Sequence, residues 1–151
     1  DILSANFSDN SFDVINVSHV IEHVPHSKTF FAELARVLKK GGTLIIKTPN
    51  SKALGRALFN TNWYHNDVPR HLYLFSEKNL NLLAQTYGLH TQQIKTRSSP
   101  KIILNSIDYV SANKSVPSKK VKWKRLLARA YVWIAKYKKQ GDEIFAVFTK
   151  N

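Results

Sequence analysis

Apolar side chains recur along this chain in two patterns, short continuous runs and helical spacing. The runs at 12–18 and 43–48 are rich in β-branched residues and bounded by turn-forming residues, which is typical of buried strands. Between them, residues 27–39 carry apolar side chains every three or four positions, which predicts a helix. We expect Ser27 to be its N-cap and Gly41 its C′ residue. The three segments together predict a strand–helix–strand unit with parallel strands.

The rest of the chain continues this alternation. In order, the predicted segments are a short helix at 51–59, a loop rich in aromatic and His residues at 60–75, a helix capped by Ser76 that ends at Gly88, a strand at 89–96, irregular structure at 98–118 with one helical turn near 102–110, a helix at 119–138 and a strand at 143–149. Four strands interleaved with helices predict an α/β fold.

The helix predicted at 119–138 is both basic and amphipathic. Its apolar residues fall on one helical face, and they are Trp123, Leu126, Leu127, Ala130, Tyr131 and Ile134, widened by Trp133 and Tyr137. Nine Lys and Arg residues and no acid lie between Lys119 and Lys139, and the net charge of the chain is +13. Three interpretations are open: a surface helix packed on the sheet, an interfacial helix on anionic lipid, or a nucleic-acid contact.

Composition excludes several classes of protein. The chain has no Cys, so disulfides and thiolate metal sites are excluded. It has no apolar run of about 18 residues that would span a membrane, and its first residues lack the regions of a signal peptide. We therefore expect a cytoplasmic protein, which the lipid interpretation would place against the inner face of a membrane. Because the chain contains no Met, we also expect it to be a fragment or a processed remainder.

Three blocks of sequence, in this order and spacing, resemble one enzyme superfamily. They are Asp9–Ile15 followed by Val20–Val24, then Glu33–Ile46 with its Arg-Val-Leu-Lys-Lys-Gly-Gly stretch, and then Pro69–Ser76 followed by Asn79-Leu80 and Tyr87-Gly88-Leu89. In these blocks the chain is similar to the class I S-adenosylmethionine-dependent methyltransferases, with a type 11 or type 23-like domain. The resemblance covers roughly residues 1–97, and 141–149 suits the family's last strand.

The resemblance implies a Rossmann-like, doubly wound sheet in the strand order 3-2-1-4-5-7-6, with strand seven antiparallel. Strands four to seven would lie in this chain, as the C-terminal part of one methyltransferase domain spanning 1–151. Its parts would be a family core at 1–97, a variable insertion with the basic helix at 98–140, and the final strand at 141–151. The strand at 12–18 would keep an open edge, which we expect another chain, such as a second copy, or further residues to cover.

The resemblance also implies that S-adenosylmethionine binds at the carboxyl ends of the strands, where open α/β sheets bind ligands. Asp1 and Ile2 occupy the position of the family's adenine contacts, although Asp1 is equally explained as a frayed terminus. Ser18 and His19 resemble the turn that contacts the methionine part. The Gly-rich loop after strand one and the acid that holds the ribose are absent, so we expect this segment alone to bind the cofactor poorly and to be inactive.

The acceptor side would need a general base for transfer to oxygen, and His suits neutral pH. His23 and His71 are the candidate catalytic residues, with His65 behind them. A loop-locking residue that hydrogen-bonds the backbone is the alternative for His71. The candidate substrate-binding residues are Glu22, Asn50, Trp63, Tyr64 and Tyr73. For the aromatic residues, the alternative is a hydrophobic cluster that pins the long loop.

The stretch from His19 to His23 also matches metal-binding patterns. Its H-x-x-E-H order is that of an inverted zinc peptidase, but here it directly follows a buried strand, so we treat that match as accidental. Some methyltransferases of ubiquinone biosynthesis and of small-RNA ends carry E-x-x-E-H at this place and bind a divalent metal. His19 replaces the first Glu of that pattern, so we assign no metal ligand and keep a divalent metal near Glu22 and His23 as an alternative.

The resulting hypothesis is an S-adenosylmethionine-dependent methyltransferase. Its acceptor would be a small molecule, a glycan or a lipid intermediate, methylated at oxygen. The alternative is an incomplete or non-catalytic methyltransferase-like module that acts in binding, including at a membrane surface. Nucleic acid is the least favoured partner, because no recognised nucleic-acid-binding module accompanies the basic helix.

Overall fold

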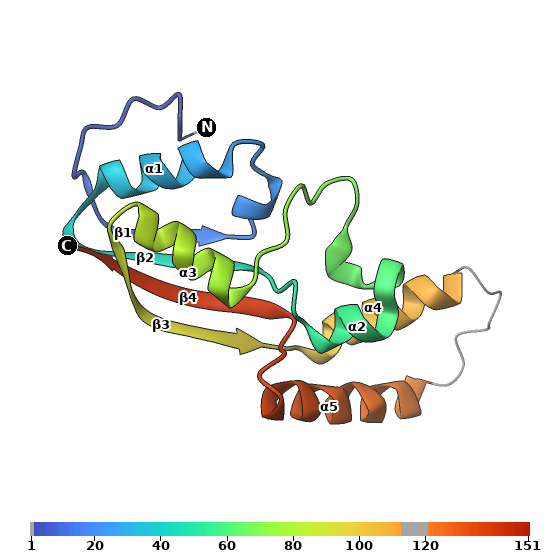
Figure 1. Cartoon of the computed structure of the whole chain (residues 1–151). Coiled ribbons are helices and arrows are strands. Elements are labelled where there is room, and N and C mark those ends of the chain that lie inside the picture. Colours follow the sequence, from blue (N-terminus) through green and yellow to red (C-terminus); the bar gives the residue numbers. More distant parts are fainter. Residues whose placement is uncertain (1, 113–120) are drawn as a thin grey trace.

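The computed structural model describes residues 2–112 and 121–151, which form a four-stranded mixed sheet with helices (Figure 1). Its strands are β1 Phe12–Ser18, β2 Leu38–Pro49, β3 Leu89–Arg97 and β4 Glu143–Lys150. Its α-helices are α1 Ser27–Val37, α2 Leu54–Phe59, α3 Glu77–Thr86, α4 Pro100–Ala112 and α5 Val121–Tyr137. Three 3₁₀ turns are η1 Ile21–His23, η2 Asn60–Asn62 and η3 Tyr64–Asn66.

The strand order is β1-β2-β4-β3. β1 pairs with β2 in parallel, and β4 runs antiparallel to both β2 and β3. This arrangement confirms the expected four-five-seven-six half of a Rossmann-like sheet. Within the described part of the chain, β1 pairs with no strand on its second edge, where Val14 is 58% exposed.

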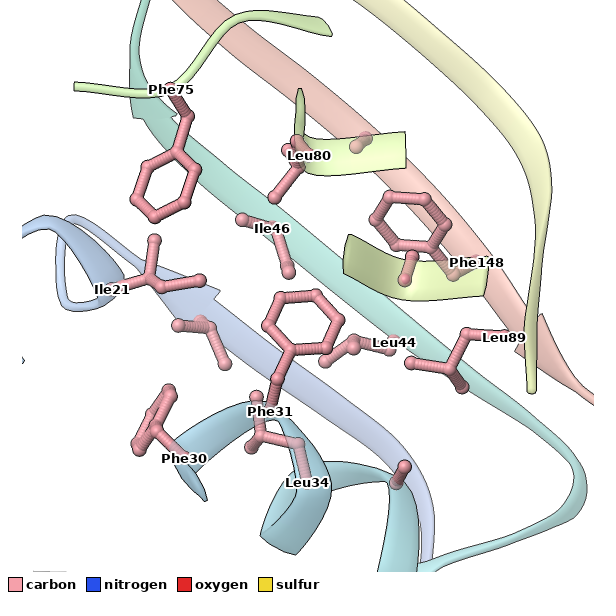
Figure 2. Close-up of a cluster of buried hydrophobic side chains, with 14 of the residues drawn as sticks. Ile21, Phe30, Phe31, Leu34, Leu44, Ile46, Phe75, Leu80, Leu89 and Phe148 are labelled. Atoms are coloured by element: carbon pink, nitrogen blue, oxygen red, sulfur yellow. The ribbon is translucent and has the colours of Figure 1, made fainter. Parts of the chain in front are cut away.

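The main core lies between the sheet and the helices α1 and α3, which cover the same face of the sheet (Figure 1). Phe31 and Leu34 of α1 meet Leu44 and Ile46 of β2, and Leu80 of α3 closes the layer (Figure 2). All five side chains are at most 1% exposed. Each fully buried side chain of this size stabilises the fold by about 1.5–3 kcal/mol relative to exposure, so this layer holds the sheet together.

The other three helices gather beyond one end of the sheet (Figure 1). α4 and α5 pack on each other through a second cluster that contains Ile103, Ala128, Tyr131 and Ala135. We call α2, α4 and α5 the helical lobe. No helix among the described residues has the length and apolarity to cross a bilayer.

Several boundaries differ from the sequence predictions. α1 ends at Val37 rather than at 39, and its N-cap is His26 instead of Ser27. Gly41 is not a helix C′ residue: it lies in β2 with φ of +74°, in a stretch where the β1–β2 register shifts. The chain passes directly from helix into strand because Leu38 is already extended and fully buried.

The largest difference is α4, because the predicted irregular segment contains a helix of 13 residues. Pro100 is its first residue, where the missing N–H is not needed. Ile102, Ile103 and Ser106 are buried, so tertiary packing stabilises a helix whose Ile, Asn and Ser residues have low intrinsic propensity. The helix predicted at 119–138 is confirmed as α5, although its first two residues lie outside the described ones.

Candidate active site

The end of β1 carries an unusual backbone turn. Ser18 is the last residue of the strand, and His19 follows with φ of +52°. The His19 N–H still donates to the carbonyl of Lys47 in β2, at 2.9 Å. A residue other than Gly in the left-handed region is uncommon, and strained residues of this kind cluster at functional sites. At this turn the His19 imidazole lies close to two carboxylates.

His19 lies between Glu143 at the start of β4 and Glu22 in η1. Its Nε2 is 3.3 Å from Oε1 of Glu143, and its Nδ1 is 3.3 Å from Oε1 of Glu22. The contacts with Glu143 and then Glu22 raise the pKa of His19 to about 9, against the opposing effect of burial. His19 is therefore an imidazolium at neutral pH, and it has no free lone pair with which to act as a base.

Both carboxylates are ionised partners of this imidazolium. Burial raises the pKa of Glu22, which is fully buried, but the contact with His19, a backbone hydrogen bond and the Thr48 hydroxyl lower that pKa below its usual value. The Thr48 hydroxyl donates to Oε2 of Glu22 at 3.0 Å. The contact with His19 lowers the pKa of Glu143 and outweighs its burial. We call His19, Glu22 and Glu143 the charged trio, which carries one net negative charge.

The two candidate catalytic histidines lie together. The rings of His23 and His71 are 4.7 Å apart between centroids. Nδ1 of His23 is 2.9 Å from the carbonyl of Arg70, and Nδ1 of His71 is 2.7 Å from the carbonyl of His65. Because a carbonyl only accepts, each Nδ1 must carry the proton and donate. An imidazole that carries a single proton on Nδ1 has its lone pair on Nε2, and Nε2 of His71 lies 3.9 Å from Oδ2 of Asp67.

A polar cavity of about 370 Å³ brings these groups together. Its lining includes His19, His23, His65, His71, Tyr64 and Glu143. We call it the histidine cavity. Burial lowers the pKa of His65, so the cavity combines a charged His19 with a neutral His65. Asn105 and Lys101 of α4 complete one side of it.

A second, mainly apolar hollow of about 660 Å³ adjoins the first along the carboxyl end of β1. It shares His19 and His23 with the histidine cavity, and Ile2 and Val20 also line it. We call it the β1 groove. Of the residues expected to bind the cofactor, Ile2 and His19 lie in this groove, Ser18 is exposed at the adjacent strand end, and Asp1 lies outside the described residues.

The structure brings only some of the expected substrate-binding residues together. Tyr64 lines the histidine cavity and stacks on Tyr109 of α4, with ring centroids 5.8 Å apart. Glu22 lies behind His19 in the charged trio. Tyr73 is partly exposed and donates its hydroxyl to the carbonyl of Pro25 at 2.8 Å, so it fastens the long loop to the segment before α1.

Asn50 and Trp63 face the interior instead. The Asn50 amide donates to the carbonyl of Gly141 at 2.7 Å, and its oxygen accepts from the N–H of Lys52 at 2.9 Å. Trp63 is 1% exposed and packs on His65, with centroids 5.3 Å apart. These contacts hold the loop at 60–75 and the end of β2 next to the histidine cavity.

Three residues could supply ligands to a metal ion. Glu22, His23 and His71 each offer one ligand atom, and these atoms lie within 4.8 Å of one another. Imidazole nitrogens and a carboxylate suit several divalent metals. Glu22 already pairs with the protonated His19, however, so a metal at this place would compete with that ion pair.

Sequence reasoning missed Glu143, the α4 residues and the role of Thr48 as the partner of Glu22. Glu143 could have been found from topology alone. In an antiparallel last strand, the first residue falls at the edge where the parallel strands end, and Glu143 pairs in register with Pro49 of β2. The residues of α4 were missed because only one helical turn, near 102–110, was predicted in a segment expected to be irregular.

Comparison with known proteins supplies the family. The methyltransferase domain family matches residues 2–94. This chain belongs to that family. A curated relative, the ubiquinone biosynthesis O-methyltransferase of Maricaulis maris (strain MCS10), is 38% identical over 66 residues, which cover 42% of this chain and 26% of that relative.

Solved structures of methyltransferases share the fold. An S-adenosylmethionine-dependent methyltransferase from Archaeoglobus fulgidus matches 99% of this chain and 65% of its own, at a TM-score of 0.63 and 15% identity. A putative sarcosine dimethylglycine methyltransferase from Galdieria sulphuraria matches 100% of this chain and 57% of its own, at a TM-score of 0.60 and 20% identity. The chain therefore spans little more than half the length of such structures.

Proposed function

We propose that the protein containing these residues transfers a methyl group from S-adenosylmethionine to a hydroxyl oxygen of a small molecule, a glycan or a lipid intermediate. Family membership supports the methyl transfer, and the relative's name, an O-methyltransferase, supports oxygen as the target. The observation that carries the proposal is the pairing of His23 and His71 in a cavity that adjoins the β1 groove.

The β1 groove and the histidine cavity provide places for two reactants. The groove runs along the carboxyl end of β1, where ligands of α/β sheets bind, and its apolar lining suits the adenosine part of S-adenosylmethionine. When bound, this cofactor supplies an electrophilic methyl group on a sulfonium. The negative charge of the trio suits such a cation, and the adjoining cavity would hold the acceptor within reach.

The two histidines would position the acceptor and take its proton. Their Nδ1 atoms are committed to backbone carbonyls, which fixes each ring and leaves Nε2 as the acceptor. A hydroxyl that donates to one Nε2 becomes a better nucleophile as its proton moves to that nitrogen. His19 cannot take this role because Glu143 and Glu22 hold it protonated. Its contribution would be to orient the carboxylates at the boundary of the two hollows.

The test uses the full-length protein and S-adenosylmethionine with a labelled methyl group. Cell extracts are separated into small-molecule, glycan and lipid fractions, and each fraction is offered as the acceptor. Treating the labelled products with base then distinguishes methyl ethers, which are stable, from methyl esters, which are hydrolysed. His23→Gln and His71→Gln are compared with His90→Gln, an exposed His on β3. We expect at least one cavity variant to lower kcat by about 10²–10⁴-fold, the usual size of a general-base contribution, with His90→Gln unchanged.

Cofactor affinity separates the possible failures. Isothermal titration with S-adenosylhomocysteine should give the same Kd for wild type, His71→Gln and His90→Gln, because neither residue lines the β1 groove, whereas His23 borders both hollows. Label incorporation at wild-type rates in both cavity variants would contradict their role. Tight cofactor binding without incorporation into any fraction would instead favour a non-catalytic binding module.

A further inference from the structure

The helix α5 has two apolar faces, and only one of them is covered. The covered face is narrow and consists of Ala128, Tyr131 and Ala135, which are at most 7% exposed and pack against Ile103 of α4. Their spacing of three and four residues is one stripe of a helix. The two Ala residues allow the helices to approach closely, and they bury little apolar area themselves.

The opposite face of α5 carries the large side chains. These are Trp123, Leu126, Leu127, Trp133, Ile134 and Tyr137, which are 39–79% exposed. They recur at the three- and four-residue spacing that puts them on one side of the helix. Trp133 and Tyr137 stack nearly parallel, with ring centroids 6.0 Å apart. Figure 1 shows α5 at the margin of the molecule, with the rest of the chain on one side of it.

Basic side chains border this outward face. By the 3.6-residue period of a helix, Arg125, Arg129 and Lys136 recur along one flank, Lys138 lies on the other, and Lys124 falls on the side that faces α4. The sequence from 121 to 141 contains no Asp or Glu. Lys124 pairs with Asp108 of α4 at 3.1 Å.

We propose that the outward face of α5 docks on the surface of a membrane that contains anionic lipid. A helix with Trp and Leu on one face and Lys and Arg beside it can lie in the interface, its apolar side chains among the acyl chains and its cations at the headgroups. Aromatic side chains such as Trp and Tyr favour this boundary.

Charge and apolar area favour this occupant over two others. A second copy of α5 would bring the same cluster of positive charge against the first, without an acid on this helix to balance it. A nucleic acid would satisfy the cations but would leave the Leu and Ile side chains exposed. Anionic lipid satisfies both features at once. The proposal does not depend on the methyl transfer, because none of the outward residues lines the histidine cavity.

The experiment measures binding of the full chain to vesicles of phosphatidylcholine alone and of phosphatidylcholine with phosphatidylglycerol, by sedimentation at low and high salt. Trp fluorescence gives an independent measurement, because Trp123 and Trp133 are exposed whereas Trp63 is buried. We expect binding only to the anionic vesicles, weakened by salt, with a blue shift and with quenching by brominated lipid acyl chains. Trp123→Phe/Trp133→Phe should abolish that shift.

Matched variants separate insertion from simple charge attraction. Leu126→Ser/Leu127→Ser removes two outward side chains that are 70% and 51% exposed. The control, Leu58→Ser/Leu82→Ser, removes two Leu side chains of α2 and α3 that are each 63% exposed. We expect the first pair to weaken binding roughly tenfold or more, because interfacial binding scales with buried apolar area, and the control pair to change it little. Arg125→Glu/Arg129→Glu should weaken binding more than Lys28→Glu/Lys78→Glu, which changes the net charge equally.

Four results would overturn the proposal. Two of them concern vesicles: equal binding to vesicles with and without anionic lipid, or equal binding by the two variants that each lose a pair of Leu side chains. The third is that wild type binds no vesicles but self-associates, and that Leu126→Ser/Leu127→Ser abolishes the self-association. The fourth is RNA binding that depends on the same two Leu residues. All the substituted side chains are exposed, so we expect the variants to stay folded. Circular dichroism of each variant checks that a loss of binding does not come from unfolding.

Discussion

The helices α1 and α5 have similar sequence patterns and opposite environments. Both carry large apolar side chains at three- and four-residue spacing. In α1 these residues, Phe31 and Leu34 among them, are at most 1% exposed against the sheet. In α5 most of the large apolar residues face outward, and the buried stripe consists of Ala128, Tyr131 and Ala135. A periodic apolar face therefore predicts a helix, but it does not predict which neighbour covers that face.

The difference follows from what each helix packs against. α1 lies across a sheet whose β2 presents Leu44 and Ile46 in one layer, so a wide face can be buried. α5 packs on α4, with Tyr131 also reaching Gly55 of α2, and these small contacts cover only a narrow stripe of the helix. The sheet core therefore holds the fold, whereas the helical lobe leaves a large apolar face exposed.

The largest expected effect tests the α1 side of this comparison. Phe31→Ala removes a fully buried ring from the centre of the core (Figure 2). We expect it to lower the free energy of unfolding by about 3–5 kcal/mol, the range for large-to-small changes in cores. Denaturant unfolding followed by circular dichroism measures it. A loss below about 1 kcal/mol would show that the site collapses around the deletion and that this core is not the main source of stability.

A smaller effect is expected where the lobe meets the sheet. A Cβ on Gly55 of α2 would lie 2.7–2.9 Å from Trp63 Nε1, Asp142 Oδ1 and the Tyr131 hydroxyl, and the Tyr131 hydroxyl donates to Asp142 at 2.6 Å. Gly55→Ala should therefore destabilise the protein by about 1–3 kcal/mol through overpacking.

The sign of this change is informative, because Gly→Ala within a helix ordinarily stabilises by about 0.5–1 kcal/mol. The control Ala130→Gly, on the exposed side of α5, should show that ordinary preference for Ala. Thermal unfolding of both variants measures the two effects. A more stable Gly55→Ala protein would mean that α5 is not anchored through Tyr131 and Asp142.

The charged trio should give a smaller, pH-dependent effect. His19 has a folded pKa of about 9 against an ordinary value of 6.5, so its contribution is complete below pH 6.5 and is lost as the pH rises through about 9. Glu22 and Glu143 have lowered pKa values, so their contribution is lost as the pH falls. Because the His19 side chain is 41% exposed, solvent screening limits its contribution to about 1 kcal/mol.

His19→Gln should therefore differ from wild type most between about pH 5 and 6.5 and least above about pH 9. Urea unfolding at several pH values measures this difference. His90→Gln, on the exposed surface of β3, is the control and should show no such window. A difference that persists unchanged above pH 9 would contradict the ion pairs.

The smallest effect on stability is expected on the outward face of α5. Leu126→Ala should change the free energy of unfolding by less than about 0.5 kcal/mol, as is usual for surface substitutions, although the same change at Leu34 in α1 should cost about 2–5 kcal/mol. Paired denaturation curves test the contrast directly. Equal losses at the two positions would show that another surface covers α5 in solution.

Local sequence patterns predicted most of the fold. The strands at 12–18 and 89–96 and the Ser76 cap, whose side chain accepts from the N–H of Asn79, follow from short-range hydrophobic spacing and capping chemistry. The family resemblance supplied the strand order. Only one helical turn was predicted where α4 forms, because the stability of this helix depends on burial of Ile102, Ile103 and Ser106 more than on helix propensity.

The candidate site was predictable only in part. The strand-end rule located His19, since it depends on topology alone, whereas His23 and His71 were predicted from the need of an oxygen acceptor for a general base. It did not predict that Trp63 is buried or that Asn50 is bound by backbone groups, because burial depends on how the long loop packs.

The sequence by itself determined where the strands form, most of the helices and several of the residues that carry chemistry, because hydrophobic periodicity and capping act between near neighbours. Only the tertiary structure decided that His19 is charged, since Glu143 comes from the far end of the chain. Only the structure decided that α5 buries its Ala stripe and exposes its Trp and Leu residues. Both outcomes depend on contacts between segments that are distant in the sequence. Such contacts form only when the whole chain is folded, so local spacing does not predict them.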